Sequence, residues 1–578
     1  MDAFVKGPVN RTSKIGVICK EQETAIVEEF FEFFKTPWEF HVPGRSYDVV
    51  MCTRPEITNV AARLLVVYGS QNTVNEKEAG AGLDSQPHGR LLEQNGVRVP
   101  IYGNILAFDE IAAPLLCLEE SNRAVAFQTA AHDLSIVRVG YDLFHEVEFL
   151  LCTGQPPVNA GIPTLEIHIS MLRDWILAAG IPVVEVPAVP QGHEFIVCLT
   201  HDVDFMRIRD HKFDHTMWGF LRRASVGSLL DLVKRKRSWI DCLKNLKAIF
   251  LLPAVYLRIC KDFWFEDFER FLRLERDLKA TFFFIPFKNR PGDKVQRRHA
   301  ERRAAAYDVN EERALLQNLM HMGHEVAVHG IDAWHSVEKG HQEHRRLAEA
   351  TQRANLGVRI HWLCFDDSSP QILDEAGFQY DSTVGYNETV GYKAGTMQVF
   401  RPKGTKSLLE LPLHIQDGAL FYPRNLSLTE SQAWRLCEGL VRNASTYGGV
   451  LTVLWHTRSL APERLWGHFY VRLLEALKVR RPWFGTAGQV VEWFRKRRAL
   501  SFRDADVSER HVRVVVEYDG SGDRNPNLML RVHLPQPHAA SRSARTFVDI
   551  PWTGQSVIDI PLGAREGERA LESCHAGN

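Results

Sequence analysis

The sequence predicts an α/β protein built around a parallel β-sheet, and three observations support this fold class. Short apolar runs rich in β-branched and aromatic residues recur between residues 193 and 456. Helical patterns lie between several of these runs, and strands that alternate with helices indicate right-handed βαβ units. The chain has 578 residues, which indicates several structural units at about 100–200 residues each. Seven such strands would nearly close a barrel.

Residues 1–190 are predicted to form an N-terminal α/β domain whose role the sequence leaves open. Its clearest helix ends at Gly180, a residue suited to a left-handed cap. The Pro-containing segment 186–192 resembles a linker. The clearest strands and helices are residues 62–69, 181–187, 25–34 and 165–180.

Residues 193–498 are predicted to contain the parallel sheet. A helix is expected over 309–323, where three leucines share one face and Gly323 ends the pattern. A second is expected over 368–377, with Pro370 in its first turn. The predicted strands are residues 194–200, 279–287, 324–330, 358–365, 377–383, 408–413 and 448–456.

Residues 505–578 are predicted to form a small β-rich accessory domain. Residues 511–518 and 527–535 alternate apolar and polar side chains, and two further short runs follow them. Helical signals are absent from this part of the sequence, which favours an antiparallel β structure.

Composition excludes several classes of protein. The net charge is -1, with 45% hydrophobic and 24% charged residues, so the chain as a whole indicates no nucleic-acid partner. The first ten residues lack a signal-peptide pattern, and the apolar run 248–257 is short for a membrane span and contains a proline. The ten cysteines are scattered without a CxxC pair, which fits reduced thiols. We therefore expect a cytoplasmic protein.

Charged and imidazole side chains collect at the ends of the predicted strands. Asp202 and Asp204 end the first strand, and residues i and i+2 of a strand point the same way. The active site of a parallel α/β barrel lies at the carboxyl ends of its strands. Similar groups occur in "HGIDAWH" (329–335), "VRIHW" (358–362), "HIQD" (414–417) and "LWH" (454–456).

Taken in order, these motifs resemble those of polysaccharide deacetylases, carbohydrate esterase family four, which have the NodB-homology fold. They are "LTHDVD", "KATFFF", "GHEVAVHG", the Arg of "GVRIHW", "EAGFQYDST" and "VLWH", over about residues 194–495. The resemblance implies a (β/α)7-type distorted barrel in a divergent member with an additional N-terminal domain. It also implies a metal-dependent hydrolase that removes an N-acetyl group from a carbohydrate.

The resemblance assigns separate roles to the two carboxylates. Asp202 is expected to be the general base and Asp204 a ligand of a divalent metal, with zinc as the expected ion. Such a metal polarises the substrate carbonyl and lowers the pKa of a bound water, and a free carboxylate then accepts that water's proton.

The expected histidine ligands match the family only in part. His329 matches the first, but position 333, where the family has a second histidine, is Ala333. We predict His335 as the third ligand, because it lies two residues further along. The alternatives left open are Asp332, His211, His215 and a weak or absent metal site.

The remaining roles follow from the same resemblance. Arg359 is expected to orient the base, and Asp417 to tune His456 as the general acid. An imidazole suits that task because its unperturbed pKa lies near neutrality. Leu454 is expected to line the acetyl pocket, and the backbone at Trp362 to contact the oxyanion.

A helical insertion is predicted over residues 206–275. Its central part, 219–261, carries ten Lys or Arg and only two acids. Trp239, Leu243, Leu246 and Phe250 fall on one helical face. The segment is interpreted either as a lid packed on the barrel or as a basic amphipathic surface for anionic lipid or a lipid-linked glycan.

These observations predict a cytoplasmic, metal-dependent carbohydrate deacetylase of cell-surface polysaccharide or glycolipid biosynthesis, peripheral to a membrane if the insertion binds lipid. The substrate is expected to be an N-acetylated carbohydrate, and no nucleic acid is expected. One alternative is a glycan-binding pseudoenzyme that has lost its metal. Another reads "DVD" as the metal motif of a glycosyltransferase, which leaves His329, Arg359 and His456 unexplained. The sugar and the oligomeric state stay open.

Overall fold

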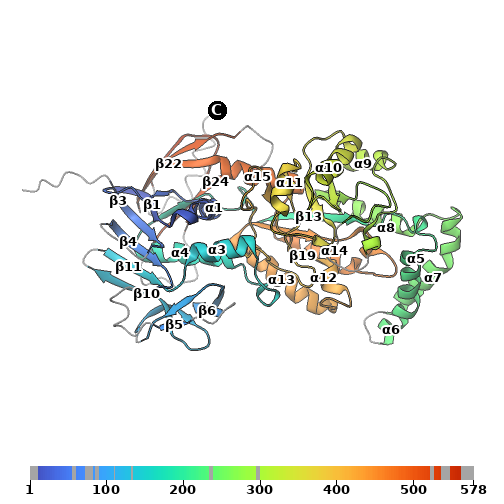
Figure 1. Cartoon of the computed structure of the whole chain (residues 1–578), viewed down its shortest axis with the longest axis horizontal. Helices are drawn as coiled ribbons and strands as arrows, with labels where there is room; N and C mark the ends of the chain where they lie inside the picture. Colours follow the sequence, from blue (N-terminus) through green and yellow to red (C-terminus); the bar gives the residue numbers. More distant parts are fainter. Residues whose placement is uncertain are drawn as a thin grey trace, which may run out of the picture. The chain divides into compact units, whose positions relative to one another are not determined.

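The protein folds into two compact units (Figure 1). The first unit comprises Met1–Gly154, Ile162–Gly192 and Trp493–Asn578, and the second comprises Gln155–Gly161 and His193–Glu492. The computed structural model describes residues 11–54, 60–71, 82–84, 90–94, 96–109, 111–131, 134–233, 238–293, 300–508, 510–520, 526–535 and 547–561.

The second unit is built on a parallel β-sheet, as the alternation of strands and helices predicts. The strand order is β18-β17-β16-β15-β14-β13-β20-β19, with β21 paired to β13, and all of these pairs are parallel. The strands are β13 (Ile196–Val203), β14 (Ala280–Phe284), β15 (Glu325–Gly330), β16 (Val358–Ile360), β17 (Tyr380–Asp381), β18 (Leu409–Glu410), β19 (Ile415–Gln416), β20 (Val450–Leu454) and β21 (Trp483–Phe484).

One bent segment, residues 409–416, connects the two ends of this half-barrel sheet. The amide of Leu411 donates to the carbonyl oxygen of Asp381 at 2.8 Å, beside β17. The amide of His414 donates to the carbonyl oxygen of Thr452 at 3.2 Å, within β20. The segment therefore pairs with one end of the sheet where it starts and with the other end where it finishes.

Helices cover the sheet and bury its strands. β13 is buried along its whole length, which explains why its first four residues, 196–199, are all apolar. In α9, Leu316 and Leu319 are fully buried in the same core as Phe282, whereas Leu315 is only partly buried. The helices are α8 (Phe263–Leu274), α9 (Arg313–His321), α10 (Val337–Thr351), α11 (Ser369–Glu375), α12 (Asp417–Phe421), α13 (Glu430–Tyr447) and α14 (Gly467–Val479), and the boundary between the two units falls within α15 (Ala487–Ala499).

The insertion between β13 and β14 is helical. The side chain of Asp214 caps α5 by accepting from two backbone amides, and Ser238 caps α7 in a capping box with Asp241. One limb consists of α5 (His215–Arg222), the π-helical turn η4 (Arg223–Gly227) and α6 (Ser228–Val233), and the other is α7 (Trp239–Tyr256).

The first unit contains a mixed nine-stranded sheet with the order β2-β1-β3-β4-β11-β10-β9-β6-β7. Its helices are α1 (Thr24–Phe34), α3 (Leu143–Cys152) and α4 (Thr164–Ala178). The strands are β1 (Arg11–Ile18), β2 (Trp38–Phe40), β3 (Ser46–Cys52), β4 (Ala61–Tyr68), β6 (Arg90–Gln94), β7 (Val97–Ile101), β9 (Pro114–Leu118), β10 (Ala124–Ala131) and β11 (Leu134–Val139); β5 (Gly82–Asp84) pairs separately with β8 (Ile105–Ala107).

The C-terminal strands pair with an N-terminal strand of this unit. β12 (Val183–Glu185) is antiparallel to β24 (Met529–His533), which pairs in turn with β25 (Phe547–Pro551). A second antiparallel sheet has the order β22-β23-β26, formed by Leu500–Val507, His511–Tyr518 and Val557–Pro561. The structure thus groups residues far apart in the sequence into one unit.

Two observations concern the setting of the protein. The nine cysteines in the described residues form no disulfide bond. Within the same residues, no helix combines the length and apolarity needed to cross a bilayer.

Candidate active site

The candidate site lies at the carboxyl ends of neighbouring parallel strands. β13 lies between β14 and β20, and β15 pairs with β16 in a register that places His329 opposite Arg359. These strands bring together Asp204, His329 and the residues that follow β16. Convergence at this edge of the sheet is what the fold class predicts.

Three side chains form a group that could hold a metal ion: Asp204, His329 and His361. Their candidate ligand atoms all lie within 4.8 Å of one another. The Nε2 of His329 is 3.2 Å from Asp204 Oδ1, and the Nε2 of His361 is 3.5 Å from the same oxygen. His329 and His361 are buried, and Asp204 is partly exposed.

The hydrogen bonds around His329 favour a cation at this point. The Nδ1 of His329 lies 2.9 Å from the carbonyl oxygen of Arg359, which can only accept, so Nδ1 carries the proton. In the neutral ring, Nε2 then presents a lone pair toward a carboxylate oxygen. His329 Nε2 and Asp204 Oδ1 are both buried without a hydrogen-bond partner among the described residues. Two acceptors facing each other in this way fit a shared divalent ion.

The electrostatics of the group keep it ready to bind a cation. Burial lowers the pKa of His361 to about 3, against the opposing effect of Asp204, so this ring is neutral near neutral pH. Burial alone would raise the pKa of Asp204, but the surrounding imidazoles of His361, His329 and His456 hold it well below its usual range. Neutral imidazole and ionised carboxylate are the forms that ligate metals.

Asp202 has a different set of partners. Its Oδ1 accepts from the Nη1 of Arg359 at 3.1 Å, and both residues are buried. Arg359 is held in turn by Thr200 Oγ1 at 2.8 Å and by the carbonyl oxygen of Ser382 at 2.9 Å. Asp202 Oδ2 lies 3.7 Å from His329 Nε2, beside the ligand group. Arg359 therefore orients one oxygen of Asp202 and leaves the other facing the site.

His456 and Asp417 form a hydrogen-bonded pair near Oδ2 of Asp204, the carboxylate oxygen that the two ligand histidines do not approach. The Nδ1 of His456 lies 2.6 Å from Asp417 Oδ1, and the His456 amide donates to Asp417 Oδ2 at 2.8 Å. Burial alone would lower the pKa of His456, but the Asp417 carboxylate raises it to about 10. The Nε2 of His456 lies 3.8 Å from Asp204 Oδ2, so its free nitrogen faces the same site.

The structure does not bring His335 into the ligand group. Its Nε2 lies 3.1 Å from Asp332 Oδ1, and the carboxylate of Asp332 accepts from the amide of Asp293. The alternative His211 is paired with Asp214 at 2.7 Å. The third position of the group is occupied by a histidine from the segment after β16.

His361 is the site residue that sequence reasoning missed. It lies in the "VRIHW" motif, two residues after Arg359. The i, i+2 rule that paired Asp202 with Asp204 would also have paired Arg359 with His361. The prediction of His335 rested on its closeness to Ala333, where the resembled family has a second histidine.

The two predicted substrate-binding residues lie at strand ends. Leu454 ends β20, is 2% exposed and lies opposite Thr200 of β13. Trp362 follows His361 with φ +66°, and Leu363 has φ +51°. Two consecutive non-glycine residues in the left-handed region mark a strained turn of the kind found at functional sites. The substrate contacts of both residues stay predictions.

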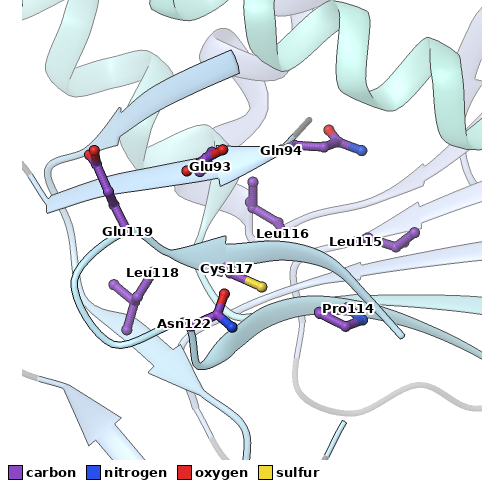
Figure 2. Close-up of a pocket in the computed structure, with 9 residues that line it drawn as sticks. All are labelled: Glu93, Gln94, Pro114, Leu115, Leu116, Cys117, Leu118, Glu119 and Asn122. Atoms are coloured by element: carbon purple, nitrogen blue, oxygen red, sulfur yellow. The ribbon is translucent and has the colours of Figure 1, made fainter. Parts of the chain in front are cut away.

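A separate hollow of about 300 Å³ lies over β6 and β9 in the first unit (Figure 2). Glu93, Cys117 and Glu119 are among its lining residues. Burial and then Glu93 raise the pKa of the Cys117 thiol, which favours the unreactive protonated form. This hollow holds no group of catalytic or ligating side chains comparable to that around Asp204.

Comparison with known proteins gives similar solved structures only. No family model matches the chain, and no curated protein matches it. A putative polysaccharide deacetylase from Mycobacterium smegmatis is 18% identical, with a TM-score of 0.33, over 54% of this chain and 95% of that one. A probable polysaccharide deacetylase from Pseudomonas aeruginosa PAO1 is 14% identical, with a TM-score of 0.34, over 54% and 94%.

A third similar structure is a CE4 family pseudoenzyme from Bacillus anthracis. It is 15% identical to this chain, with a TM-score of 0.23, over 39% of this chain and 60% of that one. The similar structures thus include the family that the sequence motifs resemble.

Proposed function

We propose that the protein is a metal-dependent hydrolase that removes an N-acetyl group from a carbohydrate. The observation that carries the proposal is the separation of the two carboxylates at the end of β13. Asp204 is grouped with two histidines, whereas Asp202 is held by Arg359. One carboxylate is therefore available as a ligand and the other as a base.

The residues of the chain supply the remaining parts of an acyl-transfer site. A divalent ion held by Asp204, His329 and His361 would polarise the acyl carbonyl and activate water. Asp202 accepts a proton through the oxygen that Arg359 leaves free. His456, oriented by Asp417, donates a proton from Nε2 to the leaving amine.

Zinc is the proposed ion. Catalytic zinc sites have three protein ligands of nitrogen and oxygen type and leave a further position for water or substrate. Two imidazoles and one carboxylate match that set. The neutral His361 ring and the ionised Asp204 carboxylate would bind it without first losing protons at neutral pH.

The proposed substrate is an N-acetylated sugar of a cell-surface polysaccharide or glycolipid, met in the cytoplasm before export. This choice is supported by the ordered motifs from "LTHDVD" to "VLWH", which resemble polysaccharide deacetylases. The fold alone would not select a substrate.

The direct test is release of acetate from N-acetylglucosamine oligomers by the purified full-length protein after zinc loading. Acetate release that stops on chelation, returns with zinc and is lost in Asp202→Asn supports the proposal. A protein that binds zinc stoichiometrically but releases no acetate from any N-acetylated glycan offered would overturn it.

A glycan-binding role without catalysis is the second candidate. It is favoured by Ala333, which occupies the position of an expected ligand and is fully buried. This candidate predicts glycan binding that is unaffected by chelation and by Asp202→Asn.

A further inference from the structure

Exposed apolar side chains are concentrated on the helical hairpin, defined here as α5, η4, α6 and α7 with the residues that flank them. Of the 22 large apolar residues exposed in the described part of the chain, 13 lie between Phe213 and Ile259. Phe250 is 81% exposed and Trp239 is 71% exposed. Large contiguous apolar surfaces are uncommon on soluble proteins and mark interaction sites.

The two faces of α7 have different surroundings. Cys242, Asn245 and Ala248 recur at helical spacing and are buried, and Ala248 packs in a cluster with Met217 and Phe220 of α5. Asn245 Nδ2 donates to Ser228 Oγ at 2.8 Å, which ties α7 to α6. The packing between the limbs therefore uses one face of α7 only.

The opposite face of α7 is apolar and exposed. Leu243, Leu246 and Phe250 follow Trp239 at helical spacing, and all four are exposed. The sequence allows this stripe either to pack on the barrel or to face solvent, and in the structure it is exposed. Among the described residues of the second unit, no segment covers this apolar stripe.

Cations accompany the apolar face. The exposed cations of the hairpin and its base include Arg222, Lys244, Lys247 and Arg258. One of the two acids of this region, Asp241, caps α7 with Ser238 and also pairs with Lys244 at 3.4 Å. By sequence, residues 219–261 have ten cations and two acids in a chain of net charge -1. Four of these ten cations, residues 234–237 (Lys-Arg-Lys-Arg), lie outside the described residues.

We propose that the helical hairpin binds the surface of an anionic lipid bilayer. Exposed Trp and Phe beside Lys and Arg form the pattern of segments that lie in the membrane interface. The positive charge complements anionic headgroups, and no described helix could span the bilayer instead. Binding at the interface buries the apolar face and keeps the cations at the headgroups.

The base of the hairpin contacts the segment that follows His456. Arg458 lies over the ring of Trp264 at 4.2 Å and over that of Phe205 at 4.9 Å. Ala461 belongs to the same apolar cluster as the residues of α5 and α7. A docked hairpin would therefore hold the candidate site close to the bilayer, where a lipid-linked sugar is found. Only this last consequence depends on the proposed function.

The test is sedimentation of the full-length protein with vesicles of phosphatidylcholine containing phosphatidylglycerol, compared with phosphatidylcholine alone. We expect binding to the anionic vesicles that weakens with added salt. Lys244→Gln, Lys247→Gln and Arg258→Gln together should reduce the partition coefficient about 100-fold, at roughly a factor of five per surface cation. Trp239→Ser, Leu243→Ser and Phe250→Ser should reduce it at least as much.

Matched controls lie elsewhere in the second unit. Arg345→Gln, Arg353→Gln and Lys478→Gln remove three exposed cations outside the hairpin and should leave binding unchanged. Circular dichroism confirms that each variant is folded.

The proposal is overturned if the wild type does not bind anionic vesicles at low salt. It is also overturned if the apolar variant instead converts a dimer to a monomer in sedimentation equilibrium, which would identify a second copy as the partner. Neither result depends on acetate release, so failure of the membrane-binding proposal can be distinguished from failure of the proposed activity.

Discussion

At the scale of single residues, the site depends on how two carboxylates from one strand are partnered. Both point to the same edge of the sheet because they are two residues apart. Arg359 neutralises Asp202, whereas imidazoles surround Asp204. The two carboxylates look equivalent in the sequence, but their different neighbours give them different chemical properties.

We predict that Asp202→Asn abolishes acetate release and leaves zinc content nearly intact, because Asp202 lies outside the ligand group. Its amide oxygen can still accept from Arg359, so the variant should fold. Asp204→Ala should lose both activity and zinc. Elemental analysis of purified protein measures the zinc. Equal zinc loss in both variants would remove the distinction between base and ligand.

We predict that His361→Ala lowers zinc affinity by more than about 100-fold, beyond the effect typical of an outer partner, because a direct ligand is lost. His335→Ala is the matched control and should have little effect, since that ring pairs with Asp332. Competition with a chelator of known affinity measures the zinc affinity of both variants. Unchanged affinity in His361→Ala together with a loss in His335→Ala would restore the original assignment of the third ligand.

At the scale of elements, helix α9 shows how the core selects one face of a helix. Leu316 and Leu319 are fully buried, and Leu315 is only partly buried. The sequence pattern predicts that all three leucines share one face of the helix, but in the structure they differ in how deeply they are buried.

Leu316→Ala should destabilise the second unit by about 2–5 kcal/mol, because it removes buried apolar contacts and leaves a cavity. Leu315→Ala on the same helix is the control and should cost clearly less. Urea unfolding followed by circular dichroism compares the two midpoints. Similar losses for both would show that α9 packs differently.

At the scale of the whole molecule, distant segments of the chain complete one unit. β12 pairs with β24, and a buried ionic group joins the two segments. Glu185 Oε2 accepts from Arg173 Nη2 at 2.7 Å, and Glu185 Oε1 lies 3.0 Å from His533 Nε2. Burial alone would raise the pKa of Glu185, but Arg173 and His533 hold it well below its usual value.

This pairing predicts how the stability of the first unit varies with pH. A carboxyl whose pKa is lower in the folded state stabilises the fold above its unfolded pKa, here about 4.5, and the contribution is lost as the pH falls below that value. Glu185→Gln should therefore lower stability at neutral pH by about 3–5 kcal/mol, because it leaves a buried cation unpaired. The difference from wild type should shrink in acid. Urea unfolding across that pH range measures it, and a pH-independent difference would contradict the assignment.

The sequence alone was sufficient for the parallel sheet, the strand-end carboxylates and the helical insertion. Each follows from local patterns, namely the period of apolar residues, capping residues and i, i+2 spacing, which act over a few residues. The third residue of the candidate metal-binding group could not be identified from local patterns. His335 and His361 are both histidines near a strand end, and only the paths of the chain after β15 and β16 decide which one reaches Asp204.

The exposure of the insertion's apolar stripe and the pairing of β12 with β24 were also decided by tertiary structure. An amphipathic helix has the same sequence pattern whether its apolar face is packed or exposed. The pattern shows which side chains share the apolar face, but it does not show what covers that face. Strand pairing between residues 183–185 and 529–533 depends on contacts between segments more than 300 residues apart, which no local pattern encodes. Local chemistry was thus readable from the sequence, whereas the choice among equivalent partners required the folded chain.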